Sequence, residues 1–198
     1  MRVAILASGN GTNFESLTKK FQSGDIPGTE ALMFCNHPHA PVIKRAERLG
    51  VPYETFSVKE CGGKDAYEKR LLKVLQDYQI DFVVLSGYLR VVGPTILDKY
   101  PNSIINLHPA LLPNYPGLNS IEKAFKDYKL GKIKETGVTV HFIDAHLDHG
   151  PIIAQQAVPI YSDDTVDTLE ARVHATEHKL FPATLKKVLS QRIEKEED

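Results

Sequence analysis

Short, continuous apolar runs alternate with helix-like segments through the first half of the chain. The predicted strands are Val3–Ala7, Ala31–Cys35, Tyr53–Phe56, Phe82–Leu85 and Ser103–Leu107. Helical patterns lie between them, among them Pro41–Leu49, Asp65–Tyr78 and a helix that ends near Tyr100. Strands that alternate with helices form βαβ units with parallel pairing and right-handed crossovers. Runs that are apolar throughout fit a sheet covered on both faces. The chain is therefore predicted to form a mostly parallel, doubly wound (Rossmann-like) α/β sheet.

The second half changes character. Val138–Ile143 and Ile152–Ile160 have the pattern of neighbouring strands joined by a turn, which predicts an antiparallel pair that extends the sheet. A helix follows from about Thr165, and we expect Pro182 to interrupt it because proline cannot donate the helical hydrogen bond. No repeat or linker divides the chain. We expect one domain over residues 1–190 and a charged, frayed tail over residues 191–198.

Composition narrows the classes of function. The 198 residues contain 24 basic and 25 acidic side chains, a formal net charge of -1, so nothing predicts binding to nucleic acid or to a membrane surface. The apolar run at the N-terminus is too short for a signal peptide, and no stretch approaches the ~20 apolar residues of a membrane span. The 2 cysteines do not make a disulfide framework. We expect a cytoplasmic protein.

A glycine-containing loop, Ser8-Gly-Asn-Gly-Thr-Asn13, separates the first strand from a helix. Thr12 and Glu15 match a capping box, which predicts a helix start near Asn13. The amides at a helix N-terminus attract anions, and glycine lets the backbone approach a ligand closely. Phosphate binding and a tight structural turn are both compatible with this loop.

A dinucleotide site fits the loop less well than a single phosphate group. Phe14 stands where the dinucleotide fingerprint needs its third glycine, and the second strand ends in Asn36 rather than in an acid that would hold a ribose. The lysine of a P-loop is absent too. If the loop binds an anion, we expect one phosphate.

Asn106 and His108 occupy the end of a predicted strand, just before Pro109. Side chains alternate along a strand, so both lie on one face, about 6.6 Å apart along the chain. Ligands of open α/β sheets bind at the carboxyl ends of strands. Histidine can act as a general acid or base, and an asparagine amide can donate to a developing oxyanion. The pair is a candidate acyl-transfer centre, although a bare Asn-x-His triplet also occurs in ordinary surface loops.

The continuation Asn106-Leu-His-Pro-Ala-Leu-Leu-Pro-Asn-Tyr-Pro-Gly-Leu118 makes the interpretation specific. Over nearly its whole length the chain resembles the phosphoribosylglycinamide formyltransferase family, the folate-dependent enzymes of purine synthesis. The resemblance implies a formyltransferase fold and transfer of a formyl group from 10-formyltetrahydrofolate to the amine of glycinamide ribonucleotide. It implies no metal, and a homodimer is one oligomeric state to consider.

The resemblance also implies roles for individual residues. Asn106 and His108 match the family's catalytic pair, and the turn Leu147-Asp-His-Gly-Pro151 identifies Asp148, rather than Asp144, as the catalytic acid. We expect Asp148 to raise the pKa of His108. Residues on the substrate-phosphate and ribonucleotide side are Gly11, Thr12, Asn13 and Glu177. Residues matching the folate site, which the C-terminal half completes, are Lys64, Leu89, Arg90, Val91, Val92 and Asn106.

Several alternatives remain beside this interpretation. His174-Ala-Thr-Glu-His178 matches the inverted zinc-protease signature H-x-x-E-H, but no third ligand stands out. His141, Asp144, His146, Asp148 and His149 could form a metal site or simply a solvated turn. Methionyl-tRNA formyltransferases and formyltetrahydrofolate deformylases have the same set of catalytic Asn, His and Asp residues. They normally carry additional domains, for which we expect no room in this chain. A non-catalytic phosphate-sensing or scaffold protein on the same fold is the remaining class.

Overall fold

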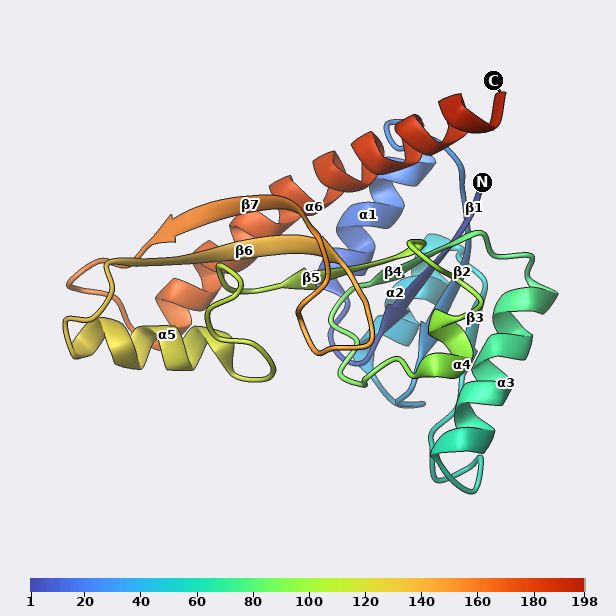
Figure 1. The fold of residues 1–198 in the computed structure, drawn as a ribbon, viewed down its shortest axis with the longest axis horizontal. Coiled ribbons are helices and arrows are strands. Elements are labelled where there is room, and N and C mark those ends of the chain that lie inside the picture. Colours follow the sequence, from blue (N-terminus) through green and yellow to red (C-terminus); the bar gives the residue numbers. More distant parts are fainter. Residues whose placement is uncertain (198) are drawn as a thin grey trace. The chain divides into compact units, whose positions relative to one another are not determined.

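The computed structural model describes residues 1–197, which form two compact units: residues 1–105 with 185–197, and residues 106–184. Seven strands make one sheet in the order β3-β2-β1-β4-β5-β6-β7. The strands are β1 (Arg2–Ala7), β2 (Thr29–Cys35), β3 (Tyr53–Thr55), β4 (Phe82–Leu85), β5 (Ile104–His108), β6 (Glu135–Phe142) and β7 (Ile152–Pro159). The helices are α1 (Thr12–Gln22), α2 (Pro41–Leu49), α3 (Lys64–Asp77), α4 (Pro94–Leu97), α5 (Ser120–Lys129) and α6 (Val166–Glu197). Figure 1 colours these elements in chain order, from blue at the N-terminus to red at the C-terminus.

The first unit is a parallel α/β layer, as the alternation of strands and helices predicts. β1 pairs in parallel with β2 and with β4, and β2 pairs in parallel with β3. The central strands are inaccessible to solvent from Val3 to Leu6 and from Leu32 to Cys35. Burial on both faces explains why these strands are apolar throughout rather than alternating. The predicted fold class is confirmed.

The second unit contains the predicted antiparallel pair. β6 and β7 pair from Glu135 opposite Pro159 to His141 opposite Ile152, with an irregularity between Val140 and His141. Figure 1 shows the two as long neighbouring arrows. α5, which the sequence analysis did not predict, packs against β6. Its buried residues are Ser120, Ile121 and Ala124, so its apolar stripe is short.

The predicted capping box is wrong. α1 begins at Thr12, and its N-cap is Gly11 in the left-handed conformation (φ 78°), with no side-chain cap. Glu15 instead binds three cations: Lys19 at 2.8 Å, Arg48 at 2.6 Å, and Arg45. A hydrogen bond with Lys19 is the largest influence on Glu15 and, with those of Arg45 and Arg48, lowers its pKa to about 2. The Glu15 carboxylate therefore forms ion pairs that link α1 to α2, and it does not cap α1.

The last helix corrects two further predictions. α6 continues through Pro182, although the proline removes one backbone hydrogen bond. Phe181, Leu185 and Leu189 are fully buried, so packing of this face holds the helix on both sides of the proline. The residues predicted as a frayed tail are helical up to Glu197, and Asp198 lies outside the described residues. The helix predicted to end near Tyr100 is α4, which ends at Leu97. Within residues 1–197, no helix is long and apolar enough to cross a membrane.

Candidate active site

The order of the strands reverses between β1 and β4, so the loops that follow these strands emerge at a topological switch point. Backbone and side-chain hydrogen bonds join them. The Ser8 amide donates to the Gly87 carbonyl at 3.1 Å, and the Leu89 amide donates to Ser8 Oγ at 2.8 Å. Ser8 Oγ in turn donates to Asn36 Oδ1, at the end of β2, at 2.5 Å. The predicted phosphate loop and the predicted folate loop therefore share one rigid edge of the first unit.

The phosphate loop has the geometry that its glycines predict. A Cβ on Gly11 would lie 2.7 Å from Val42 Cβ, and its φ is positive, so only glycine fits there. Arg45 holds the preceding residue, donating from Nε to the Asn10 carbonyl at 2.7 Å and from Nη2 to Asn10 Oδ1 at 2.8 Å. Gly11, Thr12 and Asn13 are half-buried at the start of α1. The loop thus presents the first amides of α1, where an anion is favoured.

The folate loop presents apolar side chains to solvent. Leu89 and Val91 are 63% and 62% exposed, Arg90 is exposed, and Val92 is buried. The loop is held from α3: the hydroxyl groups of Tyr67 and Tyr88 lie 2.6 Å apart, and the Arg90 guanidinium lies 5.6 Å from the centre of the Tyr67 ring. Lys64, the first residue of α3, is exposed in the same unit. Exposed leucine and valine on a braced loop can contact a flat apolar ligand.

The second unit brings Asn106, His108 and Asp148 together, as the sequence predicts for a joint centre. Asn106 Nδ2 donates to Asp148 Oδ1 at 3.3 Å, and His108 Nδ1 lies 3.5 Å from Asp148 Oδ2. The His108 and Asp148 side chains are only 5% and 8% exposed. The backbone amide of Gly117 donates to Asp148 Oδ2 at 2.7 Å. Strand alternation places the first two residues on one face of β5, and the turn after β6 returns Asp148 to them.

His141 completes this network and was considered in the sequence only as a candidate metal ligand. It is fully buried on β6, and its Nδ1 donates to the Phe142 carbonyl at 2.8 Å. With Nδ1 as the donor, Nε2 is the nitrogen that can accept, and it lies 3.1 Å from Asn106 Nδ2. Both amide hydrogens of Asn106 thus have acceptors, which fixes the orientation of the amide. Side chains alternate along a strand, so Thr139 and His141 belong to the same face of β6. This alternation is the sequence signal that could have identified His141 as a site residue.

Burial and charge act in opposite directions on the pKa values of His108 and Asp148. Burial lowers the pKa of His108 below its usual value and outweighs the Asp148 charge, which acts to raise it. Burial acts to raise the pKa of Asp148, but the nearby His141 ring, the Gly117 amide and the His108 charge together lower it. His108 is therefore neutral and Asp148 ionised at neutral pH. The expected effect of Asp148, to raise the pKa of His108, is present, but the opposing effect of burial is larger.

Neutral His108 has a defined tautomer. Its Nε2 lies 2.8 Å from the Tyr115 carbonyl oxygen, which can only accept, so Nε2 carries the proton. Nδ1 is then an unprotonated base beside the Asp148 carboxylate. The pair can take up one proton, because an imidazolium formed there would be stabilised by the adjacent negative charge.

Glu177 is buried on α6, where its Oε2 accepts a hydrogen bond from His174 Nδ1 at 2.8 Å. His174 Nε2 also contacts Glu170 Oε1 at 3.3 Å. Both nitrogens of His174 thus face carboxylates. Within residues 1–197, the H-x-x-E-H motif joins no cluster of three metal-ligating side chains. The structure therefore does not support the protease interpretation of this motif.

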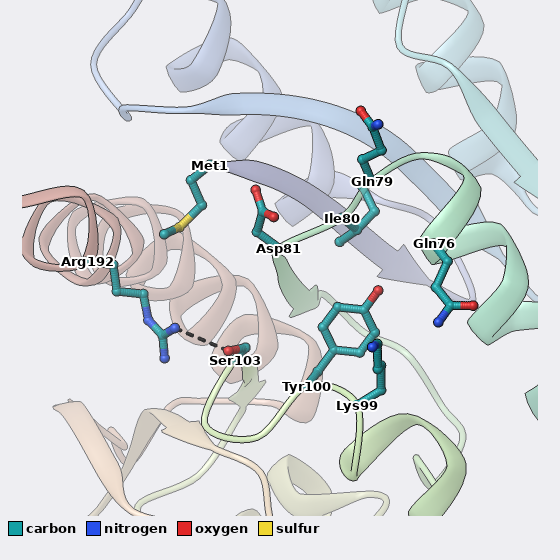
Figure 2. A pocket seen from close by; sticks show the side chains of 9 residues that line it. All are labelled: Met1, Gln76, Gln79, Ile80, Asp81, Lys99, Tyr100, Ser103 and Arg192. Atoms are coloured by element: carbon teal, nitrogen blue, oxygen red, sulfur yellow. Dashed lines mark hydrogen bonds between the residues drawn. The ribbon is translucent and has the colours of Figure 1, made fainter. Parts of the chain in front are cut away.

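A hollow of about 500 Å³ in the first unit lies elsewhere. It is lined by residues that precede strands, including Met1 before β1, Asp81 before β4 and Ser103 before β5. Figure 2 shows Arg192 donating to Ser103 Oγ at its edge, at 3.1 Å. Ligands of parallel sheets bind at the carboxyl ends of strands, whereas this hollow is at the amino ends. None of the predicted site residues lines it.

The fold is an α/β sheet, and its second unit holds an imidazole and a carboxylate side by side next to an amide, a set of groups that can act as acid, base and hydrogen-bond donor. The family model "Formyl transferase" matches residues 1–185, so the chain belongs to the formyl transferase family. It is 39% identical over 188 residues to the phosphoribosylglycinamide formyltransferase of Bacillus subtilis, covering 95% of this chain and 94% of the relative. It is 33% identical to the Escherichia coli protein of the same name, covering 93% and 85%.

A solved structure has the same fold. The phosphoribosylglycinamide formyltransferase of Bacillus halodurans superposes with a TM-score of 0.91 and 45% sequence identity, covering 97% of each chain. This likeness extends over both units and includes the elements that carry the candidate site.

Proposed function

We propose that this chain transfers the formyl group of 10-formyltetrahydrofolate to the amine of N1-(5-phospho-D-ribosyl)glycinamide, a step of de novo purine biosynthesis. The products are the N2-formyl derivative and tetrahydrofolate. The observation that carries the proposal is the buried Asn106–His108–Asp148 network in a member of the formyl transferase family. The relatives named above supply the choice of substrates.

Asn106 is the proposed donor to the formyl oxygen. Attack of the amine on the formyl carbon places negative charge on that oxygen, and a fixed amide N–H stabilises it without reorganisation. In the free protein His141 Nε2 and Asp148 Oδ1 accept from the Asn106 amide at 3.1 and 3.3 Å. The second of these is long, so the N–H directed at Asp148 is the one that substrate can take over.

His108 and Asp148 are the proposed proton carriers. The amine loses a proton as the new C–N bond forms, and the folate nitrogen must gain one as its bond to carbon breaks. The unprotonated Nδ1 of His108, 3.5 Å from Asp148 Oδ2, can accept the first proton and deliver the second. The balance is one proton moved from the amine to the departing nitrogen.

The remaining residues are proposed to bind. The amides of Gly11, Thr12 and Asn13 at the start of α1 would hold the substrate phosphate, and Glu177 would contact the rest of the ribonucleotide. Leu89 to Val92 would line the pterin pocket with Asn106, and Lys64 would face an acidic part of folate. A lysine gives a point charge there, not a bidentate contact. A single catalytic domain over residues 1–190, a cytoplasmic location and a homodimer belong to the same proposal.

The decisive experiment mixes the protein with glycinamide ribonucleotide and 10-formyltetrahydrofolate and follows the absorbance of the deformylated folate. Formylated product that requires the amine is the expected result. Release of folate at the same rate without the amine would indicate a hydrolase, and no reaction would overturn the proposal.

The Asn106→Ala variant tests the role of the amide in the same assay. Loss of one oxyanion donor lowers kcat by about 100-fold to 1,000-fold, and we expect that loss with little change in KM. An effect confined to KM would instead assign Asn106 to uniform substrate binding.

A further inference from the structure

One half-buried and two exposed side chains gather in the turn between β6 and β7, outside the Asn106–His108–Asp148 network. They are Asp144, His146 and His149, and one ligand atom from each lies within 4.8 Å of those of the other two. Asp144 Oδ2 is 3.3 Å from His149 Nδ1, and Asp144 Oδ1 is 3.6 Å from His146 Nδ1. The centres of the two imidazole rings are 5.4 Å apart. Three potential ligands thus converge within six residues of chain.

The ligand atoms lie within reach of the spacings that a small divalent cation requires. With metal–ligand bonds of about 2.0–2.1 Å in a tetrahedral site, neighbouring ligand atoms lie roughly 3.3 Å apart. The two contacts between imidazole and carboxylate, 3.3 Å to Asp144 Oδ2 and 3.6 Å to Asp144 Oδ1, are near this value but use different oxygens, so binding through one oxygen requires the imidazoles to turn toward it. The side chains of His146 and His149 are 76% and 74% exposed, so they can rotate to bring their ring nitrogens to this distance from each other. Two imidazoles with one carboxylate suit zinc better than magnesium or calcium, which prefer oxygen ligands alone.

The turn that carries these residues is anchored at its base. The Phe142 amide donates to the Pro151 carbonyl at 2.9 Å, and a Cβ on Gly150 would lie 2.8 Å from the carbonyl carbon of Phe142. The Asp144 carboxylate also accepts from the His146 amide at 2.7 Å, which fixes its own direction. The backbone of a short, closed turn loses little conformational entropy when its side chains bind an ion, so the entropy cost falls on the two imidazole side chains.

We propose that Asp144, His146 and His149 bind one divalent transition-metal ion of the zinc type, with a fourth position open to water. The site lies on the turn that carries Asp148 but does not use it, because the Asp148 oxygens are bonded to Asn106 and Gly117. The proposed formyl transfer and the metal site are separate: either can exist without the other. A metal bound here would act on the turn, not on the reacting atoms.

The test is a titration of tag-free protein with zinc alone, by calorimetry and by competition with a coloured chelator. One equivalent is expected for the unaltered chain. The double variant His146→Gln, His149→Gln is expected to bind about 100-fold more weakly or not at all, because removing ligands costs at least as much as removing their supporting partners. Circular dichroism checks that the surface variant is folded.

Two matched controls use the chain's other potential ligands. His174→Gln alters the H-x-x-E-H motif, whose residues join no group of three potential ligands among the described residues, and Cys61→Ser removes the more accessible thiol. Both variants are expected to keep the full equivalent of zinc. No binding by the unaltered protein, or equal binding by the double variant, would overturn the proposal.

Discussion

Asp148 is the residue on which the proposed proton transfer most depends, and its backbone lies in the left-handed region with φ 50°. Asparagine tolerates this conformation and can still accept from the Gly117 amide, so Asp148→Asn keeps the turn while it removes the charge. We expect turnover to fall by about 100-fold or more, the usual contribution of a positioned acid or base. Steady-state kinetics with both substrates measures it.

Asp163→Asn is the matched control, because Asp163 is an exposed acid of the same unit. It is expected to retain normal turnover. If Asp148→Asn also retained it, Asp148 would have no part in proton transfer.

The pKa of His108 gives a second prediction. Burial lowers it below the usual 6.5, so the folded chain binds fewer protons at this site than the unfolded chain as the pH falls through 6.5. The site therefore costs stability below that pH and costs none above it. Titration by nuclear magnetic resonance should show a midpoint under 6.5, and a lower one still in Asp148→Asn, which lacks the charge that raises it. The resonance is assigned among the 8 histidines by its absence from His108→Gln.

A midpoint above 6.5 in the unaltered protein would mean that Asp148 outweighs burial. His108 would then enter the reaction protonated, as an acid, not as the base described above.

At the residue scale, the sequence predicts which side chains share a strand face, but it does not predict the net pKa of a buried group. Alternation along a strand is enough to align Asn106 with His108, but the partner 42 positions after Asn106 is found only through family resemblance. The net pKa of His108 depends on how deeply the ring is buried, and no sequence pattern measures that. The five-residue candidate metal set divides in the structure: His141 and Asp148 join the Asn106–His108 network, and Asp144, His146 and His149 form the separate cluster on the turn.

At the scale of elements, the start of α1 offers a sharp test. Gly11→Ala would add a Cβ that collides with Val42 and would force a side chain into the left-handed region. The left-handed conformation costs about 1–2 kcal/mol and overpacking about 1–3 kcal/mol, so unfolding free energy in urea should fall by roughly 2–5 kcal/mol. Gly9→Ala is the matched control, since nothing lies within 4 Å of its Cβ and its φ is not positive.

Gly9→Ala is expected to change the free energy of unfolding by no more than about 0.5 kcal/mol. If both variants lost the same free energy of unfolding, the loop would have adapted around Val42. The description of the phosphate loop as rigid would then be wrong.

Elements were predictable where one local signal dominates. Pro41–Leu49 and Phe82–Leu85 match their predicted bounds, because proline at a first turn and an uninterrupted apolar run are strong signals. α5 was missed, since it buries only a narrow stripe and its N-cap, Asn119, caps without a side-chain hydrogen bond. The capping box at Thr12 failed because Thr12 is already inside α1 and because Glu15 pairs with Lys19 of α1 and with the two arginines of α2. Tertiary contacts of this kind are invisible in a short pattern.

At the scale of the whole molecule, the change from parallel to antiparallel pairing was predictable, because apolar runs with helices between them give way to two strands joined by a turn. The two compact units were not predictable. Their boundary falls inside β5, between Ile105 and Asn106, and inside α6, between Thr184 and Leu185, where the sequence shows no linker. Single-domain organisation over residues 1–190 therefore stays a prediction.

Cooperative unfolding tests that organisation. β5 and α6 each run through both units, so neither unit can unfold without breaking a strand and a helix that the other also needs. We expect one transition, with a calorimetric enthalpy equal to the van't Hoff enthalpy. Hydrogen exchange supplies a residue-level check: amides of β1 and of β6 should share the same highest opening free energy. Two calorimetric transitions, or strands that open at clearly different free energies, would show that the units are independent domains despite the elements they share.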